Sequence, residues 1–330
     1  MAPTLRDLVS IEALGPNEFV SKINPVRLGN AAPIAYGGCA LSTAMRAAFA
    51  TVPDNAGFAP YSMLGHYLGP AATDRKLYAR VTSTRQSRSF ATRRVEIRQK
   101  LDNGQFRNCL EATVDFHAHE PSVMEYSAPT WGQWAHPEDC PVMILHAGAD
   151  DDAMVRRVAT EAQAAMFRQT FASMAAFFET RNCTNGVAAQ NLNGVVKTAQ
   201  TTQHTLPLTA RLSADWSRGL DALATPAENF AALVFLMDGG LSFLPLCHGN
   251  LWFDDVGACS SLDFAARFFT GQVRVEDWVL RERQTSRAGE GRTYSEGRFF
   301  DVSGQMVASM TQQSIMRARP ARAKKDHAKM

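Results

Sequence analysis

Two polar residues stand where the sequence is otherwise apolar, and their side chains could do chemistry. Asp238 ends the apolar run of residues 230–237 and is followed by two glycines. Gln312 is the polar exception on one face of a predicted strand whose other members are mostly methionine. A buried carboxylate and a buried amide both need hydrogen-bonding partners. We therefore regard the pair as a candidate site; alternatively, Asp238 faces water where a helix ends, and Gln312 only satisfies a backbone group.

The composition is that of an ordinary globular protein. The chain has 330 residues, of which 45% are hydrophobic and 20% charged, and its formal net charge is +2. This length allows two domains or one large one, and so small a charge does not attract nucleic acid in general. The first residues have no apolar core typical of a signal peptide, and no apolar run is long enough to span a membrane. We expect a soluble intracellular protein with no nucleic-acid partner.

The cysteines and histidines indicate neither a metal site nor a cofactor. Six cysteines lie far apart, without a CxxC pair, as is typical of reduced, buried thiols in an intracellular compartment. The segment "HAHE" (117–120) carries two alternating histidines, which are more typical of a strand surface than of a metal site. The sequence also has no Gly-x-Ser-x-Gly elbow, phosphate-binding loop or dinucleotide fingerprint.

The two halves of the chain repeat one pattern of strands. Residues 76–117 and 277–317 each read as three long strands, with a Ser/Arg-rich first turn and a second turn that contains Gly-Gln. The second turns, "NGQF" (103–106) and "SGQM" (303–306), lie at matching places. The repeat predicts two antiparallel units with the same architecture.

A helix is predicted ahead of each set of strands. Residues 36–52 carry one apolar stripe at four-residue spacing. Residues 225–237 begin with threonine, proline and a capping-box glutamate, which are typical of a helix start. A short strand is expected before each helix, at 18–23 and 174–181. Between the halves lies a linker that turns helical over residues 151–171.

The order of these motifs resembles the double hot-dog proteins, and specifically the type II acyl-CoA thioesterase family. The resemblance runs from about residue 18 to 317, and five segments carry it: "YGGCALSTAM" (36–45), "YLGP" (67–70), "SFATRRVEIRQ" (89–99), "SLDFAARFF" (261–269) and "VASMTQQSIMR" (307–317). It implies an α+β fold with two antiparallel sheets, each wrapping a central helix. It divides the chain into an N-terminal hot dog (1–119), a linker with a helix (120–173), a C-terminal hot dog with the catalytic set (174–318) and a basic tail (319–330).

The resemblance also implies a function: an acyl-CoA is hydrolysed to a free carboxylic acid and coenzyme A by an activated water. By position, the acid of the family falls on Asp238, its strand hydroxyl on Ser261 and its glutamine on Gln312. The carboxylate would accept the proton of the water that attacks the thioester carbonyl. Backbone N–H groups near Gly37 and Gly38, at the start of the first helix, would stabilise the oxyanion and line the acyl-CoA tunnel.

The position of the acid has alternatives. An ungapped alignment of "FLP" (243–245) with the family pattern puts Gly240 at the acid position, and two inserted residues are needed to recover Asp238. Two residues turn a helical side chain by roughly 200°, so the insertion matters. The next candidate is Asp263, with residues 254–255, both aspartates, further behind.

The sequence also leaves open which serine supplies the hydroxyl of the site. Strict alternation along 261–268 gives Ser261 the face of Asp263, opposite the apolar residues of the strand. A slip of one residue in the register would bring Ser260 into its place.

Two basic segments could contact partners. Arg93 and Arg94 could bind the phosphates of coenzyme A, or they could simply lie on a solvated strand face. The chain ends in Ala328-Lys329-Met330, which is similar to the Ser-Lys-Leu type of peroxisomal address and follows a basic stretch. These residues predict binding to the peroxisomal import receptor and a location in peroxisomes; the alternative is a solvated tail on a cytoplasmic protein.

Two other functions fit the same scaffold. One is an acyltransferase or an enzyme that releases a polyketide or another acyl group from its thioester. The other is a catalytically degraded acyl-CoA-binding protein, which the shifted Asp238-Gly-Gly segment keeps open. The Asp-x-Asn-Pro-x-His pattern of hot-dog hydratases does not occur. By resemblance, two hot dogs in one chain mimic a hot-dog dimer, and further pairing of chains is common, so a homo-oligomer is expected. The resemblance also implies a role in lipid or fatty acid metabolism.

Overall fold

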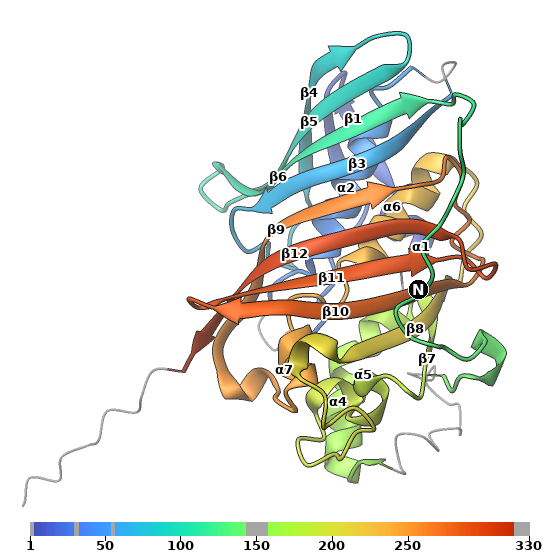
Figure 1. Cartoon of the computed structure of the whole chain (residues 1–330). Coiled ribbons are helices and arrows are strands. Elements are labelled where there is room, and N and C mark those ends of the chain that lie inside the picture. The colour runs from blue at the N-terminus through green and yellow to red at the C-terminus, as the bar shows by residue number, and fades with distance from the viewer. Residues whose placement is uncertain (1–2, 30–32, 54–56, 143–157, 320–330) are drawn as a thin grey trace, which may run out of the picture.

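A continuous antiparallel sheet curves around two apolar helices (Figure 1). The structure is a computed structural model that describes residues 3–29, 33–53, 57–142 and 158–319. The terminal Ala328-Lys329-Met330 lies outside the described residues. Within them, twelve strands form one sheet in the order β1-β2-β4-β5-β6-β3-β9-β12-β11-β10-β8-β7. The strands are β1 (Ile11–Gly15), β2 (Glu18–Ser21), β3 (Phe58–Tyr67), β4 (Tyr78–Gln86), β5 (Phe90–Lys100), β6 (Phe106–Ala118), β7 (Phe178–Asn182), β8 (Leu212–Gly219), β9 (Val256–Phe268), β10 (Val279–Gly289), β11 (Arg292–Phe300) and β12 (Met306–Ala318).

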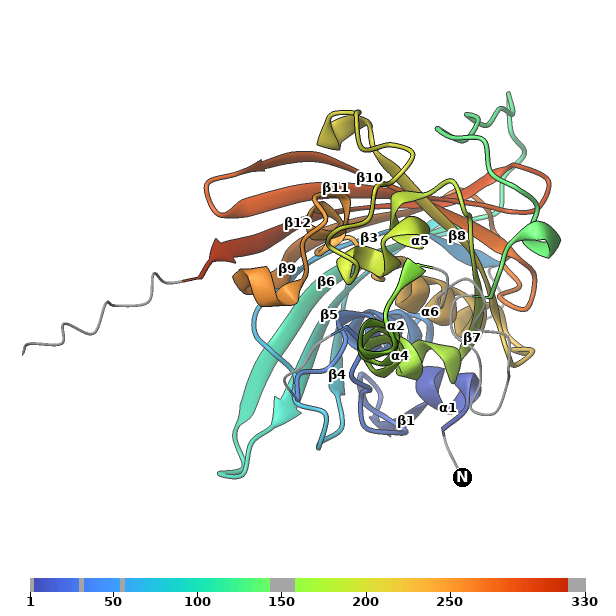
Figure 2. The same ribbon diagram turned by 90° about the horizontal axis from the view of Figure 1, so that it is seen from below.

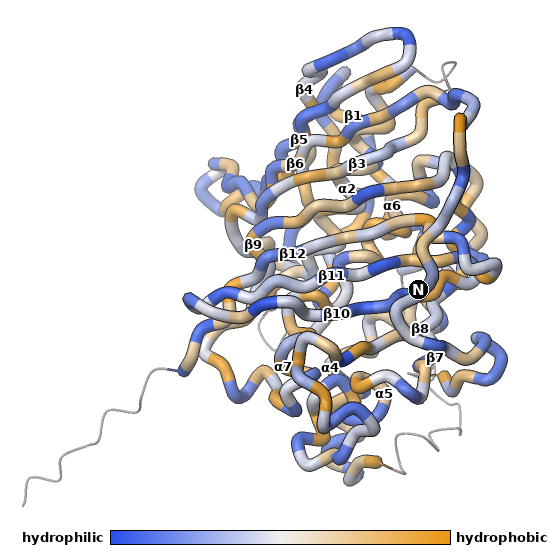
Figure 3. The backbone as a smooth tube through the Cα atoms, viewed as in Figure 1, coloured by the Kyte–Doolittle hydropathy of each residue, from blue (hydrophilic) through white to orange (hydrophobic). Residues whose placement is uncertain are grey.

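The two halves of the sheet have the same internal order. β1-β2-β4-β5-β6-β3 in the first half corresponds to β7-β8-β10-β11-β12-β9 in the second, and the halves meet where β3 pairs with β9. The sequence predicts two sheets, whereas across the described residues the halves share one, because this pairing satisfies the edges that two separate sheets would leave open. Hydrophobic and hydrophilic residues alternate along the long strands, as expected when one face covers the helices (Figure 3).

The sheet arches over the long helices α2 (Gly37–Phe49) and α6 (Pro226–Met237) (Figure 2). Their rings meet near both ends: Tyr36 and Phe235 have centroids 4.9 Å apart, and those of Phe49 and Phe230 are 6.1 Å apart. The helices therefore run antiparallel, and the end of α6 lies beside the start of α2. Every residue from 229 to 237 is buried, which explains why α6 is apolar all round.

The remaining helices cover the edges of this core. They are α1 (Leu5–Val9), α4 (Glu161–Ala175), α5 (Val187–Gln190) and α7 (Leu244–His248), with the 3-10 turns η2 (Pro137–Asp139), η3 (Leu192–Gly194), η4 (Leu208–Ala210) and η5 (Phe253–Asp255). In the described part of the chain, no helix is long and apolar enough to cross a membrane.

Most of the predicted elements are confirmed. The capping box at the start of α6 is present, since Thr225 and Glu228 exchange side-chain and backbone hydrogen bonds. The helix α4 (Glu161–Ala175) covers the later part of the linker helix predicted over 151–171, and residues 143–157 lie outside the described residues. The strand predicted at 174–181 begins only at Phe178, because α4 continues through Ala175.

Candidate active site

Asp238 lies where three elements meet. It follows the last residue of α6, is 6% exposed and lines a cavity of about 960 Å³. Its Oδ1 accepts hydrogen bonds from the hydroxyl of Tyr67 (2.8 Å) and from Nε2 of Gln312 (2.5 Å). The backbone N–H of Gly38 donates to the same carboxylate. The buried acid therefore has the partners that its burial requires.

The start of α2 is built around this carboxylate. Tyr36, the residue before α2, makes no side-chain cap, and Asp238 takes the N–H of Gly38 instead. A Cβ on Gly37 would come within 2.8 Å of Asp238 Oδ2 and 2.9 Å of the Tyr67 ring. Only glycine allows this close approach, which places the carboxylate at the positive end of the helix dipole.

Opposing effects act on the ionisation of Asp238. Burial raises the pKa of its carboxyl group above the ordinary aspartate value. The hydrogen bonds from Tyr67, Gln312 and Gly38 act against this rise, because they stabilise the charged form. The balance leaves the pKa raised, as is typical of a carboxylate that accepts a proton during catalysis.

Gln312 connects the carboxylate to a hydroxyl. Its side chain is fully buried on the inner face of β12, as the methionine-rich face predicts. Nε2 donates to Asp238, while Oε1 accepts a hydrogen bond of 3.2 Å from Ser261 Oγ. The three predicted residues are thus brought together in the order hydroxyl, amide, carboxylate.

Ser261 reaches Gln312 because the strand register between β9 and β12 is interrupted. β12 pairs with β9 so that Gln313 lies opposite Asp263 and the next residue, Ser314, lies opposite Ser261. Leu262 is passed over, which is the arrangement of a β-bulge. The bulge turns Ser261 inward although strict alternation gives it the face of Asp263. Ser261 therefore makes the bond to the glutamine, while Ser260 is an exposed residue at the cavity.

The other candidate acids lie elsewhere. Asp263 Oδ1 accepts the backbone N–H of Gln313 at 3.1 Å. Asp254 and Asp255 both pair with Lys197, at 2.7 Å each. Among the described residues, Asp238 and Asp215 are the carboxylates that line the cavity, and Asp238 is the one bonded to Gln312.

The structure corrects the prediction for Arg93 and Arg94. Arg93 is 2% exposed, and its guanidinium donates to the carbonyl of Thr51 (2.9 Å), to Thr51 Oγ1 (3.0 Å) and to the carbonyl of Arg85 (2.9 Å). It binds the chain just beyond α2, where carbonyls are left without helical partners. Arg94 is exposed and pairs with Glu111 at 2.7 Å. Neither arginine lines the cavity, so neither is placed to bind the substrate.

The sequence did not predict several other polar residues that line the cavity. Tyr67 belongs to the "YLGP" segment, but the sequence alone shows no partner for its hydroxyl. Arg281 and Arg283 line the cavity from β10, and Arg317 lines it from the exposed end of β12. Alternation along "VLRERQ" predicts that Arg281 and Arg283 share one face of the strand, but it does not tell whether that face is the inner one.

Comparison with known proteins identifies the family to which these features belong. The model of the acyl-CoA thioesterase C-terminal domain matches residues 137–316, more than half of the chain, and the model of the acyl-CoA thioesterase N-terminal domain matches residues 24–117. No curated protein matches the sequence significantly.

Solved structures share the whole fold. An acyl-CoA thioesterase II (TesB2) from Mycobacterium marinum is 19% identical, with a TM-score of 0.65 over 96% of this chain and 98% of that one. A tesB protein from Mycobacterium avium subs paratuberculosis is 18% identical, with the same TM-score and coverage. A conserved protein with a hot dog fold from Alicyclobacillus acidocaldarius is 16% identical, again with a TM-score of 0.65 and coverage of 96% and 98%. At these identities, the likeness shows a hot-dog-like α+β fold.

Proposed function

The chain belongs to the acyl-CoA thioesterase family, and we propose that Asp238, Gln312 and Ser261 activate the water with which it hydrolyses an acyl-CoA. One observation carries the proposal: a carboxylate with a raised pKa lines the large cavity and is bonded to a buried amide. A carboxylate and an amide side by side offer a water both an acceptor and a donor.

The reaction follows from these positions. The water oxygen attacks the thioester carbonyl carbon while Asp238 accepts the proton of the water. The carbonyl oxygen becomes an oxyanion beside the N-terminal end of α2, where Gly37 lines the cavity. The C–S bond then breaks, and the proton held by Asp238 passes to the sulfur of coenzyme A. Gln312 and Ser261 hold the carboxylate and the water in place, and no covalent enzyme intermediate is needed.

The two ends of the cavity suit the two parts of the substrate. Arg317 and Ser260 lie at its exposed end, on β12 and β9. A guanidinium in solvent can bind phosphate without a large desolvation cost. We therefore assign the coenzyme A moiety to this end, in place of the predicted contact with Arg93 and Arg94. The acyl group then points inward, under the sheet.

We also propose that each half is one hot-dog unit, so that the chain is a double hot dog. The supporting observation is that each half has six strands in the same order and one long enclosed helix. The proposed units are residues 1–119 and 174–318, with residues 120–173 as a linker and 319–330 as a tail. Separate expression of 174–318 tests the division: a soluble unit that folds cooperatively would support it, and an insoluble product would count against it.

Release of free thiol from a panel of acyl-CoAs tests the proposed function. We expect wild type to hydrolyse the panel and Asp238→Asn to lower kcat by about 10²- to 10⁴-fold. Asp263→Asn is the matched control, since Asp263 lies outside the cavity, and it should hydrolyse as wild type does. Circular dichroism and thermal unfolding check that each variant is folded. Unchanged hydrolysis by folded Asp238→Asn would exclude Asp238 as the base.

The same panel separates the alternatives. An acyltransferase or acyl-releasing enzyme would transfer the acyl group to an added alcohol or amine faster than to water. A degraded binding protein would bind acyl-CoA without turnover, and the position of Asp238 beside Gln312 argues against that.

We propose import into peroxisomes through Ala328-Lys329-Met330, a role in fatty acid metabolism, and a homo-oligomer. A fluorescent fusion with and without the last three residues tests the address. Light scattering of the purified chain tests the assembly: a monomer mass would exclude the oligomer.

A further inference from the structure

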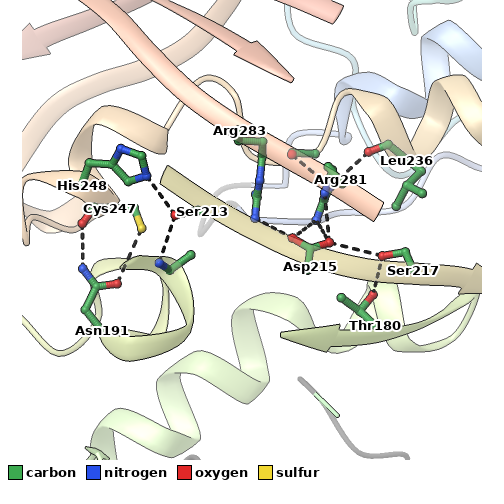
Figure 4. Close-up of polar contacts among 12 residues, drawn as sticks. Thr180, Asn191, Ser213, Asp215, Ser217, Leu236, Cys247, His248, Arg281 and Arg283 are labelled. Atoms are coloured by element: carbon green, nitrogen blue, oxygen red, sulfur yellow. Dashed lines mark hydrogen bonds and ion pairs between the residues drawn. The ribbon is translucent and has the colours of Figure 1, made fainter. Parts of the chain in front are cut away.

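A second group of buried charges lines the cavity, on the strands next to the far edge of the sheet. Asp215 on β8 and Arg281 and Arg283 on β10 are 1%, 6% and 4% exposed. Arg281 donates to both oxygens of Asp215 at 3.1 Å, and Arg283 Nη2 donates to Oδ2 at 2.5 Å. Figure 4 shows both guanidinium groups pointing at the one carboxylate. We call these three residues the arginine cluster.

The arginine cluster has more positive than negative charge. Two guanidinium groups bond to one carboxylate, so the cluster itself has one excess positive charge; the other carboxylate of the cavity, Asp238, is bonded to Tyr67 and Gln312 and not to either arginine among the described residues. Glu282, between the arginines in sequence, points to the opposite face of the sheet, where it accepts hydrogen bonds from the N–H groups of Trp131 and Gly132. An uncompensated buried charge is costly, so an anion that enters the cavity would be bound there.

The two arginines differ in how far their donors are used. Arg281 also donates to the carbonyls of Leu236 (3.1 Å) and Gly239 (3.0 Å), so it binds the end of α6. Arg283 bonds to Asp215, and its buried Nε has no partner among the described residues. Burial and the neighbouring Arg281 lower the pKa of Arg283. Arg283 is thus the arginine with hydrogen-bonding capacity left for a ligand.

The cluster lies close to the proposed catalytic carboxylate. Gly239 and Gly240 follow Asp238 directly, and a Cβ on either would clash with Nη1 of Arg281 or of Arg283, respectively. Gly240 also has a positive φ of 93°. The two glycines therefore let the chain pass over the guanidinium groups. Across the sheet, Arg283 is in line with Gly297 of β11 and Met310 of β12, so Gln312 lies two strands away and two residues further along β12.

The first half of the sheet has no charge at the place of Arg283. In the second half, Arg283 pairs with Gly297 of β11. At the matching place in the first half, Ala79 of β4 pairs with Ile97 of β5. An apolar pair thus serves in one half where an arginine stands in the other. The enclosing sheet therefore does not require an arginine at the place of Arg283, and a ligand is another reason for one to stand there.

We infer that the arginine cluster is a subsite for the far end of the acyl group, and that the preferred substrates are acyl-CoA thioesters whose acyl group ends in a carboxylate. The inference rests on the proposed function. A carboxylate in this subsite neutralises the net charge and accepts the free donors of Arg283. The buried position favours the slender acyl chain over the phosphates of coenzyme A, which need room and solvent.

Matched substrate pairs test the inference: succinyl- against butyryl-CoA, adipyl- against hexanoyl-CoA, and suberyl- against octanoyl-CoA. The readout is the ratio of kcat/KM within each pair. We expect wild type to favour the carboxylate-ended member of at least one pair by roughly 10- to 100-fold, the worth of a hydrogen bond between charged groups. Arg283→Gln should bring that ratio to one or below. Arg287→Gln, an exposed arginine on the same strand, should leave it unchanged.

A binding measurement with wild type keeps the test independent of whether Arg283→Gln folds. Suberate or adipate should raise the unfolding temperature more than octanoate or hexanoate does. Hydrolysis of the plain acyl-CoAs without any preference for carboxylate ends would overturn the inference and leave the thioesterase function intact. Absence of hydrolysis of every substrate would overturn the proposed function, and the binding measurement would still decide whether the subsite takes a carboxylate.

Discussion

The two halves of the sheet share a backbone and differ in what they present to the helices. Their second turns match closely, with Gly104 at φ 81° and Gly304 at φ 82°. From these turns the registers run in parallel: Val95 lies opposite Ala112 in the first half, and Ser295 lies opposite Gln312 in the second. At this pair of positions the first half is apolar and the second is polar, although the first half has buried polar residues elsewhere, such as Arg93 and Gln99.

The difference separates the needs of folding from those of the reaction. An apolar pair at these positions is enough beside α2, and it would be enough beside α6. Polar groups at the same places cost free energy unless each is bonded. In the second half, Gln312 has such bonds, to Asp238 and Ser261, whereas the buried hydroxyl of Ser295 has no partner among the described residues. This fits the proposal that the second half carries the reaction, while the first contributes the start of α2 and Tyr67.

The largest expected effect comes from making the second half resemble the first at one position. Gln312→Ala copies Ala112 and removes the donor to Asp238. We expect kcat to fall by about 10²- to 10³-fold, as when a single positioned donor is removed from an active site. Thiol release from acyl-CoA measures this.

Gln313→Ala is the matched control, since it removes the same side chain from the opposite face of β12. It should keep kcat within about twofold. A small effect of Gln312→Ala, or an equal loss in both variants, would break the distinction between the two faces.

The contribution of the first half can be measured through Tyr67. Its hydroxyl lowers the pKa of Asp238 by donating to the charged form, although burial keeps that pKa raised overall. Tyr67→Phe removes this bond, so the pKa of Asp238 should rise further. Because the base acts only when deprotonated, the acid limb of the kcat/KM profile should move to higher pH, by roughly one to two units.

The shift in the pH profile is the decisive readout, since a merely structural tyrosine would lower activity at every pH alike. A profile of unchanged shape would remove Tyr67 from the site and leave the second half to act without the first.

The sequence predicts much of this arrangement, and its failures have physical causes. Asp238 and Gln312 were predictable because each interrupts an apolar pattern. Ser261 was assigned by resemblance, and its inward direction depends on a bulge at Leu262 that alternation cannot show. Arg93 was assigned to the substrate because arginine binds phosphate, although nothing in sequence separates that role from binding a helix end.

The two halves can also be compared by how an arginine at the end of each long helix contributes to stability. Arg93 on β5 binds the chain beyond α2, as Arg281 on β10 binds the end of α6. Arg93→Met leaves the carbonyl of Thr51 without its donor, and we expect the free energy of unfolding to fall by about 1–3 kcal/mol. Urea unfolding measures this change. KM for acyl-CoA should stay unchanged in the folded variant; a raised KM with unchanged stability would restore the role in substrate binding.

The smallest expected effect concerns the hydroxyl at the end of the chain of contacts. Ser261 Oγ donates to Gln312 over 3.2 Å, so it orients the amide that in turn holds Asp238. A hydrogen bond of this kind contributes about 0.5–1.5 kcal/mol, so Ser261→Ala should lower kcat by up to about tenfold. Ser260→Ala is the control, because Ser260 is exposed and differs by one register position. A loss in Ser260→Ala with none in Ser261→Ala would mean that β9 pairs without the bulge in solution, and the polar contacts of the second half would then need a different register.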